Sequence, residues 1–461
     1  MKPLADRIRA LPARHGRTTL LLLAAIALVG LAARAYVVVN PVAEPGDDSR
    51  AYFALSKSLY EEGSFGGPGF RDPSDWSPGA PLLYAAAYFL TGGAREGTAR
   101  AVEALCGLAA ILVAFALGRR LARAVGGDPE PEPSGDPGRR PPSRADAVGL
   151  LAALGVAVYP PFLHSTGVLM SEPPAVLTLP AAVLAFLWAA ERRRPWAWLA
   201  PGLLFGITAM LRPEYLLVGA AFVALAGLRA GAARGPRAGL AAAAVLAVAT
   251  ALPILPWTVR NAIVLDRLVP ISTGGGKALY VGTFLPGDGE YQRVKARLAK
   301  RYLGRDLEPG SPELDAVDPR PLFDRVAARH PELPRDEALG RVGKENLSKF
   351  LSEDALGYAA MTVRKVARMW SSGVGEAMSS RPGRVVQVAL VAAALGGLAL
   401  LARRRRWWEL AATATPPLVV TAVGAASLAA PRRNEVLMGI AIPLAALALS
   451  SAAAALSSAR R

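Results

Sequence analysis

The sequence has little of what disulfide-linked or zinc-binding proteins use. Cys106 is the single cysteine among 461 residues, so an intrachain disulfide and a multi-cysteine metal site are excluded. The three histidines, His15, His164 and His330, lie far apart in the sequence, which argues against a His-rich metal site. Acidic residues are also relatively scarce: 36 of them face 53 lysines and arginines, which gives a formal net charge of +17.

Long apolar runs, in contrast, are abundant. Hydrophobic residues make up 52% of the chain and the mean hydropathy is +0.30. The runs are continuous and about 17–25 residues long, which suits helices that cross a ~30 Å hydrocarbon core. We therefore predict an all-α polytopic membrane protein with about ten transmembrane helices. They fall near residues 18–39, 100–120, 147–163, 173–190, 196–211, 214–230, 238–258, 384–402, 409–430 and 435–457.

The positive charge is concentrated in short loops between these runs. Examples are Arg119–Arg120, Arg192–Arg194 and Arg403–Arg406, and with ten spans all of them fall on the side of the basic N-terminus. This agreement with the positive-inside rule explains the charge without a nucleic-acid partner, and we expect none. It predicts a multi-pass membrane protein with both termini in the cytoplasm. Met1–Arg17 is basic, but the apolar run after it is long and lacks a clear cleavage site, so we interpret it as a first anchor.

Three regions follow from this topology. Residues 1–258 form an N-terminal transmembrane module with an external loop at 40–99 and a cytoplasmic linker at 121–146, which is Pro-, Gly- and charge-rich and expected to be disordered. Residues 259–383 form a small external segment with amphipathic helices near 290–302, 321–330 and 345–370. Residues 384–461 carry the last spans. Pro78–Thr91 is apolar but too short to cross easily, so we place it in the outer interface as an amphipathic or re-entrant helix, with Tyr84 and Tyr88 near the level of the lipid headgroups.

Ionisable residues stand at the outer ends of several spans. Each has a simple structural explanation: Asp48 suits a helix cap, Glu172 a helix N-terminus and Arg212 an interfacial position. The functional alternative is that carboxylates act as a general base or metal ligands, whereas arginines bind phosphate oxygens. Arginines outside the membrane also oppose the charge rule and need a reason. The candidates are Asp47, Asp48, Tyr52, Glu172, Arg212, Glu214, Arg260, Arg432 and Arg433.

The order of these motifs resembles the GT-C class of polytopic membrane glycosyltransferases. The similarity is to bacterial relatives of the protein O-mannosyltransferases and the lipid A aminoarabinose transferases, and the sequence looks like glycosyltransferase family 39. It rests on Gly46–Leu59 after the first span, the Pro-rich Ser77–Tyr84, Glu172 after the third span, and the later segments Leu211–Tyr215, Pro256–Asn261 with Val269–Thr273, and Arg432–Arg433. The second acidic position, often Asp in that family, is Glu172 here.

The resemblance implies an inverting hexosyl- or pentosyltransferase of cell-envelope biogenesis, mannosyltransferase-like in type. It would take a sugar from a polyprenyl-phosphate donor and transfer it to a lipid, glycan or protein acceptor on the outer face of the membrane. Either Asp47 or Asp48 would be the base, with Glu172 as the other catalytic carboxylate. Tyr52, Arg212, Glu214, Arg260, Arg432 and Arg433 would bind substrate. The resemblance implies no firmly bound cofactor but allows Mg²⁺, Mn²⁺ or Ca²⁺ at Asp47 and Glu172.

Two other functions fit a polytopic membrane protein. A transporter or lipid flippase places polar sites near the middle of the bilayer and often repeats one half of the fold in the other. A scaffold subunit that has lost activity would tolerate amides at Asp47, Asp48 and Glu172. The ionisable residues at outer helix ends favour the glycosyltransferase over both.

Overall fold

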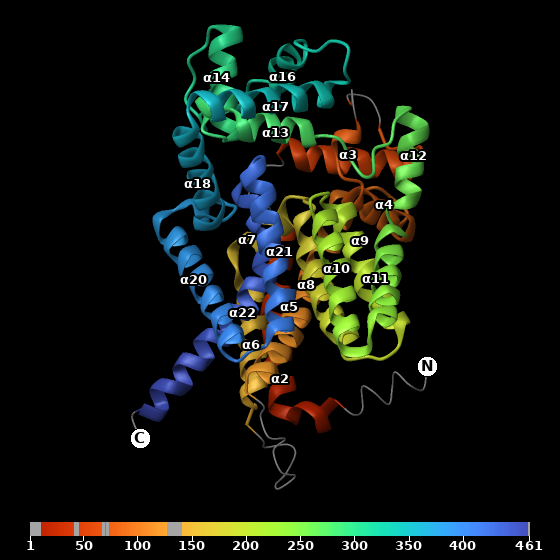
Figure 1. Ribbon diagram of the computed structural model, residues 1–461, viewed down its shortest axis with the longest axis vertical. Coiled ribbons are helices and arrows are strands. Elements are labelled where there is room, and N and C mark those ends of the chain that lie inside the picture. Colours follow the sequence, from red (N-terminus) through yellow and green to blue (C-terminus); the bar gives the residue numbers. More distant parts are fainter. Residues whose placement is uncertain (1–10, 41–45, 67–69, 71–72, 127–140, 460–461) are drawn as a thin grey trace.

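The protein is a helical bundle with a smaller helical cap at one end (Figure 1). It is described here from a computed structural model for residues 11–40, 46–66, 70, 73–126 and 141–459. These described residues form helices and connecting loops and no β-strand. The predicted linker 121–146 overlaps α5 and α6 at its ends, and its central part, 127–140, lies outside the described residues.

Ten segments of the described chain account for the ten predicted spans. Seven helices are long and apolar enough to cross a membrane alone, and two bent helix pairs pass the same test together. The remaining expected span, 196–211, is a shorter apolar segment, Pro195–Leu211. The prediction of an all-α polytopic membrane protein is confirmed. The bundle consists of α2 (Leu11–Val39), α5 (Glu96–Val125), α6 (Arg144–Val158), α7 (Pro160–Gly167), α8 (Glu172–Ala189), η2 (Pro195–Trp198), α9 (Leu199–Leu211), α10 (Tyr215–Arg234), α11 (Pro236–Ala251), α12 (Leu255–Leu265), α20 (Arg381–Arg403), α21 (Trp407–Ala426) and α22 (Pro431–Ala459).

Prolines explain the two bent spans. The α6–α7 pair bends by 43° where Pro160 and Pro161 follow Tyr159, and the α11–α12 pair bends by 49° around Pro253 and Pro256. Proline removes a backbone donor and clashes with the preceding turn, so a helix ends or kinks there. Both breaks lie at the end of the bundle that faces the cap (Figure 1).

Burial separates central from peripheral helices. In the most apolar stretch of each helix, 72% of the residues of α8 and 67% of those of α22 are buried, against 17% for α2 and 22% for α20. A helix that is apolar on all sides and buried lies at the centre of a bundle, whereas exposed apolar surface on a membrane helix faces lipid. The first residues of the two central helices therefore meet where the cap joins the bundle.

The first external loop packs between the bundle and the cap. It contains α3 (Asp47–Glu61), η1 (Pro73–Asp75) and α4 (Gly79–Thr91), and α4 is the short apolar helix that the sequence places in the interface. We expected Tyr84 and Tyr88 at the level of the lipid headgroups. Both side chains are instead fully buried inside the protein, and the large exposed apolar residues of this helix are Leu82, Phe89 and Leu90.

The cap has its own hydrophobic core and lies over the first external loop. It comprises α13 (Gly275–Thr283), η3 (Leu285–Gly287), α14 (Tyr291–Leu303), α15 (Pro312–Asp315), α16 (Pro319–Ala327), α17 (Arg335–Glu353), α18 (Ala355–Ser371) and α19 (Glu376–Ser379). The expected single helix near 345–370 is wrong, because the chain breaks at Asp354, whose side chain caps α18 through the backbone N–H of Gly357 (2.8 Å).

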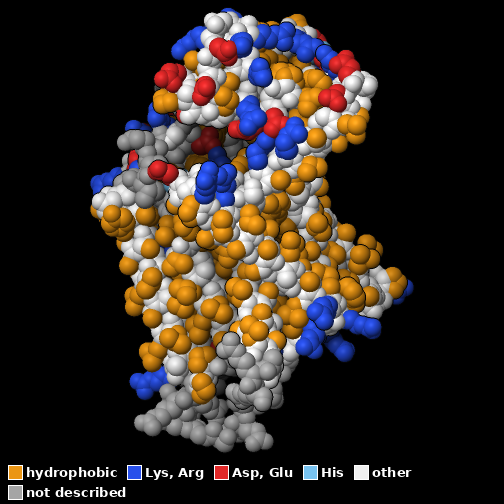
Figure 2. Space-filling view, turned by 90° about the vertical axis from the view of Figure 1, so that its left-hand side faces the viewer, with side chains coloured by type: hydrophobic (Ala, Val, Ile, Leu, Met, Phe, Trp, Pro, Cys, Tyr) orange, Lys and Arg blue, Asp and Glu red, His pale blue; other side chains and the backbone are white. Residues whose placement is uncertain are grey.

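The two ends of the bundle differ in the charge they carry. Figure 2 shows a mostly apolar middle, with charged side chains on the cap, around the hollow beneath it, and at the far end. At the far end Arg120 pairs with Glu191 and lies 3.5 Å from Glu409, and Arg234 donates to the carbonyl of Arg192 (2.8 Å). The basic loops after α5, α8, α10 and before α21 therefore gather together, opposite the cap.

Candidate active site

Glu172 is the centre of a buried group of charges. It is the first residue of α8 and is fully buried. Its Oε1 accepts a hydrogen bond from Nη1 of Arg212 (2.5 Å) and another from Nε of Arg432, and its Oε2 accepts one from Nη2 of Arg432 (3.2 Å). A buried carboxylate is stable only when paired and hydrogen-bonded, and two guanidinium groups meet that requirement here.

Arg432 bridges Glu172 to the first external loop. Its Nη1 donates to Oδ2 of Asp48, so one guanidinium joins α3, α8 and α22. The Asp48 side chain keeps 37% of its surface exposed, whereas that of Glu172 keeps none. Asp48 is therefore the carboxylate that a molecule entering from outside reaches first. The side chain of Asp47 lies outside the described residues.

Arg212 extends the group to the start of α10. Its Nε and Nη2 both donate to Oε1 of Glu214, at 3.1 and 3.0 Å. Burial alone would raise the pKa of Glu214, but the guanidinium groups of Arg212 and Arg433 outweigh it and hold that pKa at about 2. Glu214 is consequently an anion at any physiological pH.

Three carboxylates and three guanidinium groups thus gather at one end of the bundle, and their formal charges cancel. We call them the ion cluster. They are Asp48, Glu172, Glu214, Arg212, Arg432 and Arg433.

Arg433 differs from its neighbour in having an unused donor. Within the described residues its buried Nη1 has no hydrogen-bond partner, and the buried hydroxyl of nearby Tyr215 has none either. Buried donors are nearly always satisfied in native proteins, so an orphan in a polar site calls for an explanation such as a missing ligand. Arg433 is therefore the cation of the cluster best placed to receive an anion.

The structure places the other two candidates differently. Tyr52 is buried beside the cluster and hydrogen-bonds Ser171, and burial raises the pKa of its phenol, which stays neutral. Arg260 lies on α12, where it donates to the carbonyl of Phe65 (3.2 Å) and stands 5.1 Å from the ring of Trp257. Its described contacts join α12 to the first external loop and do not include the ion cluster.

Two buried acids of the site were not singled out from the sequence. Glu435 Oε1 accepts a hydrogen bond from Ser165 (2.5 Å), and Glu103 contacts Tyr84 and the backbone of Met170. Glu103 stands inside an otherwise apolar span. That position is itself a signal of function, because ionisable residues within membrane helices are costly.

The ion cluster does not fit a resident metal ion. A cation between Asp48 and Glu172 would have to displace the guanidinium of Arg432, which already binds both. In the part of the chain that the structure describes, no three His, Cys, Asp or Glu side chains are grouped so as to hold a metal. The expected pair Asp47 and Glu172 is not tested, because the Asp47 side chain is not described.

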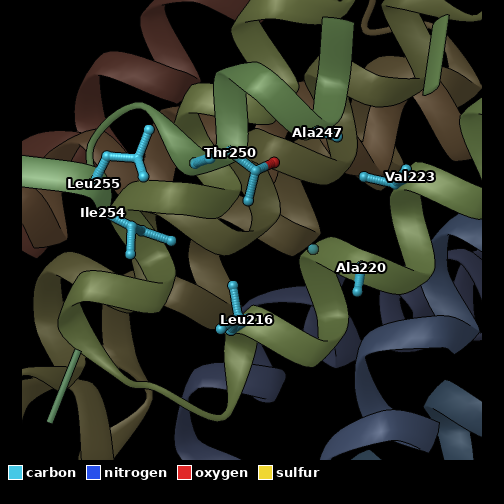
Figure 3. A pocket seen from close by; sticks show the side chains of 9 residues that line it. Leu216, Ala220, Val223, Ala247, Thr250, Ile254 and Leu255 are labelled. Carbon is cyan, nitrogen blue, oxygen red and sulfur yellow. The ribbon is translucent and has the colours of Figure 1, made fainter. Parts of the chain in front are cut away.

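An apolar groove lies beside the cluster. It encloses about 370 Å³ between α10 and the bent α11–α12 pair, and Figure 3 shows Leu216, Ala220 and Val223 across from Ala247, Ile254 and Leu255. Its one polar side chain, Thr250, donates to the carbonyl of Leu246 (2.8 Å) and so presents little polarity. Leu216 follows Glu214 by two residues, so the groove begins next to the charged end of α10.

No protein-family model matches the sequence, and no curated protein matches it. Similarity appears among solved structures. The oligosaccharyltransferase AglB from Archaeoglobus fulgidus, in complex with an inhibitory peptide and a dolichol-phosphate, has a TM-score of 0.52 and 14% identity over 96% of this chain and 51% of that one. The Archaeoglobus fulgidus oligosaccharyltransferase in complex with zinc and sulfate has a TM-score of 0.53 and 16% identity, and the match covers 94% of this chain and 49% of that one. ArnT from Cupriavidus metallidurans bound to undecaprenyl phosphate has a TM-score of 0.38 and 15% identity, and the match covers 94% of this chain and 78% of that one.

The chain spans about half the length of the archaeal enzymes. With sequence identities of 14% and 16%, the similarity to the archaeal enzymes shows a shared fold and no more. It agrees with the resemblance noted from the order of sequence motifs. The protein is a multi-pass membrane protein that shares its fold with the oligosaccharyltransferase AglB from Archaeoglobus fulgidus.

Proposed function

We propose that this protein transfers a sugar from a polyprenyl-phosphate donor to a hydroxyl acceptor at the cap end of the bundle. The observation that carries the proposal is the ion cluster, in which a reachable carboxylate, Asp48, lies beside partly buried arginines. Acceptor activation needs a base, and departure of a lipid phosphate needs positive charge nearby.

Asp48 is the proposed general base. The acceptor hydroxyl gives its proton to Asp48 while its oxygen bonds to the anomeric carbon from the face opposite the phosphate. The bond between that carbon and the phosphate oxygen breaks, and its electron pair stays on the phosphate. One negative charge thus moves from Asp48 to the lipid phosphate, and the anomeric configuration inverts.

The arginines would compensate for this movement of charge. Arg433 has a free buried donor for the phosphate before the reaction. Arg432 loses one of its two ionised partners when Asp48 takes the proton, and its Nη1 is then available for the charge that grows on the phosphate, while Glu172 keeps the guanidinium in place. Preorganised cations at a site of developing charge are among the largest contributions to catalysis.

The lipid part of the donor has a suitable surface. The α10–α11 groove is apolar, begins beside Glu214 and has a volume in the range of ligand sites. The AglB structure that shares the fold contains a dolichol-phosphate and an inhibitory peptide, which supports a lipid-linked donor and an acceptor at one site.

We infer that the cap end is extracytoplasmic and the basic end cytoplasmic. The arginine-rich loops after α5, α8, α10 and α20 gather at the end opposite the cap, as the positive-inside rule requires. In this orientation both termini are cytoplasmic and the protein works on the outer face of a plasma membrane.

The alternative of a transporter or flippase is less well supported. Transporters hold substrate near the middle of the bilayer. Here most buried charges of the described spans lie toward helix ends: Glu172 is the first residue of α8, Asp146 the third of α6 and Glu409 the third of α21, whereas Glu103, the eighth residue of α5, lies deeper. Because the ion cluster lies at the cap end of the bundle, the arrangement favours chemistry there over passage through the middle.

A transfer assay with matched variants tests the proposal. The protein in lipid nanodiscs is incubated with radiolabelled polyprenyl-phosphate sugars and a membrane extract as acceptor. Wild type and Glu308→Gln, an exposed position on the cap, should transfer label. Asp48→Asn and Glu172→Gln should lose at least 100-fold in rate, with Asp48→Asn still binding donor. Absence of transfer and of donor binding in wild type, for every sugar, would favour transport instead.

A further inference from the structure

The turn that presents Glu172 is held under backbone strain. It runs from Val168 to Ser171, between α7 and α8, and Leu169 has a φ of +31°. A branched side chain rarely adopts such a conformation, which persists only where the surroundings impose it. What fixes this turn therefore also fixes the start of α8.

Glu103 and Tyr84 make the contacts that hold the turn. Glu103 Oε1 accepts a hydrogen bond from the backbone N–H of Met170 (2.6 Å). The hydroxyl oxygen of Tyr84 lies 2.5 Å from the same Oε1 and 2.9 Å from the carbonyl oxygen of Met170. Both side chains are fully buried, so no solvent competes for these bonds.

These contacts form a closed ring that needs one more proton than an ionised Glu103 supplies. The N–H of Met170 supplies one. Tyr84 has a single hydroxyl proton, but its oxygen lies within hydrogen-bond distance of two acceptors, Glu103 Oε1 and Met170 O. A proton on Glu103 completes the ring: the acid donates to Tyr84, and Tyr84 donates to Met170 O.

The surroundings agree with a neutral acid. No Lys, Arg or His nitrogen within the described residues forms an ion pair with Glu103, and its Oε2 has no hydrogen-bond partner. Arg100, one turn earlier on α5, is instead paired with Glu96 (2.8 Å). A buried carboxylate without a cation is far more costly than the protonated acid.

The same turn touches the ion cluster on its other side. Ser49, next to Asp48, donates to the carbonyl of Val168 (2.5 Å), and Arg432 Nη2 lies 3.8 Å from Sδ of Met170. Tyr52 hydrogen-bonds Ser171. A shift of the turn would therefore displace Glu172 and Asp48, the two carboxylates that bind Arg432.

We propose that Glu103 is a neutral carboxylic acid that acts, together with Tyr84, as a positioning residue for the ion cluster. Its effect on transfer rests on the proposed function, whereas its protonation and its hold on the turn do not. Misplacing reacting groups by about 1 Å costs about 100-fold in rate. The group acts through Glu172 and Arg432 and does not touch substrate.

Two measurements independent of activity test the proposal first. An infrared difference spectrum between wild type and Glu103→Gln should show the carbonyl stretch of a protonated acid in wild type alone. The matched control is Glu96→Gln, on the same helix with a partly exposed side chain; the difference spectrum between wild type and this variant should lack that band, because both proteins keep Glu103. Hydrogen exchange of a peptide covering 165–172 should be faster in Glu103→Leu and Tyr84→Phe than in Glu96→Gln.

Kinetics then separate positioning from a general loss of structure. Glu103→Leu should lower kcat about 100-fold with donor KM within a few-fold of wild type, and Glu103→Gln should restore most of kcat because it stays neutral and can donate. Tyr84→Phe gives the same test with a smaller change in volume. An infrared band of an ionised carboxylate from Glu103 would overturn the proposal. So would a Glu103→Leu enzyme whose kcat and whose hydrogen-exchange rate in residues 165–172 equal those of Glu96→Gln. If wild type transfers no sugar, the infrared and exchange results still decide it.

Discussion

Two adjacent arginines of α22 have different surroundings, and this difference predicts different defects. Arg432 is bound by Asp48 and Glu172, whereas Arg433 keeps a buried donor without a partner. Arg433→Gln should raise the donor KM by about 10- to 100-fold, because a hydrogen bond to a charged group contributes about 1.5–3 kcal/mol. Steady-state kinetics with varied donor would measure this.

Arg432→Gln is the contrasting control for that measurement. Removing one partner of a buried ion pair costs about 3–5 kcal/mol, because the other charges are left uncompensated. This variant should therefore lose thermal stability as well as kcat, whereas Arg433→Gln should keep its stability. Equal donor KM values in wild type and Arg433→Gln would show that the phosphate binds elsewhere.

The position of Arg432 also predicts independence from divalent metals. Its guanidinium supplies the positive charge between Asp48 and Glu172 that a metal ion would otherwise provide. Transfer after treatment with EDTA and gel filtration should stay within about two-fold of the untreated rate. A loss of activity that Mg²⁺, Mn²⁺ or Ca²⁺ restores would show that a metal replaces Arg432 in the working enzyme, and Asp47 would then be the first ligand to test.

Lys365 of the cap predicts a pH dependence of stability. Burial, and then the nearby charges of Arg433 and Arg368, lower the pKa of Lys365 to about 8 from 10.5. Between these values the unfolded chain binds a proton that the folded chain does not, so the free energy of unfolding should rise from pH 8 to 10.5. The slope cannot exceed about 1.4 kcal/mol per pH unit for one proton.

Comparison with Lys365→Met isolates this contribution. The neutral amine keeps two N–H groups, enough for the carbonyls of Gly282 (2.8 Å) and Ser427 (2.9 Å) that it contacts. The contact therefore survives deprotonation, and stability should not fall. The unfolding free energy of wild type should rise relative to that of Lys365→Met as the pH rises from 8 to 10.5. If the difference between the two proteins does not change with pH, the pKa assigned to Lys365 is contradicted.

At the scale of elements, the junction of α13 with α21 depends on one glycine. A methyl group at Gly282 would overlap the backbone carbon and oxygen of Ser427, so the two elements approach as closely as they do because position 282 has no side chain. Gly282→Ala should reduce stability by about 1–3 kcal/mol, the usual cost of overpacking. Thermal unfolding in detergent would measure it.

Gly97→Ala provides the control for that substitution. Gly97 also lies in a helix, α5, but nothing lies within 4 Å of an added Cβ. Alanine favours helix over glycine by up to about 1 kcal/mol, so this variant should be as stable as wild type or slightly more stable. If both variants unfolded at the same temperature as wild type, α13 and α21 would not be in the contact described.

Elements that depend on local properties were predictable from the sequence. The predicted spans match described apolar helices because apolar runs of spanning length form them, and α4 is the short apolar helix expected from a run that is too short to cross. The break at Asp354 was missed because amphipathic spacing continues across α17 and α18, while the cap is a single side-chain hydrogen bond. The spacing of apolar residues alone cannot reveal a helix break of that kind.

The site was predictable only in part, for a related reason. Asp48, Glu172, Arg212, Glu214, Arg432 and Arg433 were singled out because each stands at the outer end of an apolar run. Their pairing, however, joins residues 260 and 384 positions apart in the chain. Arg260 shares the same sequence signal yet contacts the first external loop. Sequence position predicted that these residues share one end of the bundle, and packing decided which of them meet.

At the scale of the whole molecule, the basic loops and the ion cluster occupy opposite ends, and this predicts which end is outside. The chain has one cysteine, Cys106, so single-cysteine variants are made on a Cys106→Ala background. Ala233→Cys, at the exposed α10–α11 turn, reports on the basic end, and Glu308→Cys reports on the cap. In right-side-out membrane vesicles a membrane-impermeant maleimide should label Glu308→Cys and spare Ala233→Cys until detergent is added. The reverse pattern would place the ion cluster on the cytoplasmic side, where a donor displayed on the outer face could not reach it, and the proposed reaction would fail on topology even if Asp48 and Arg433 bind as described.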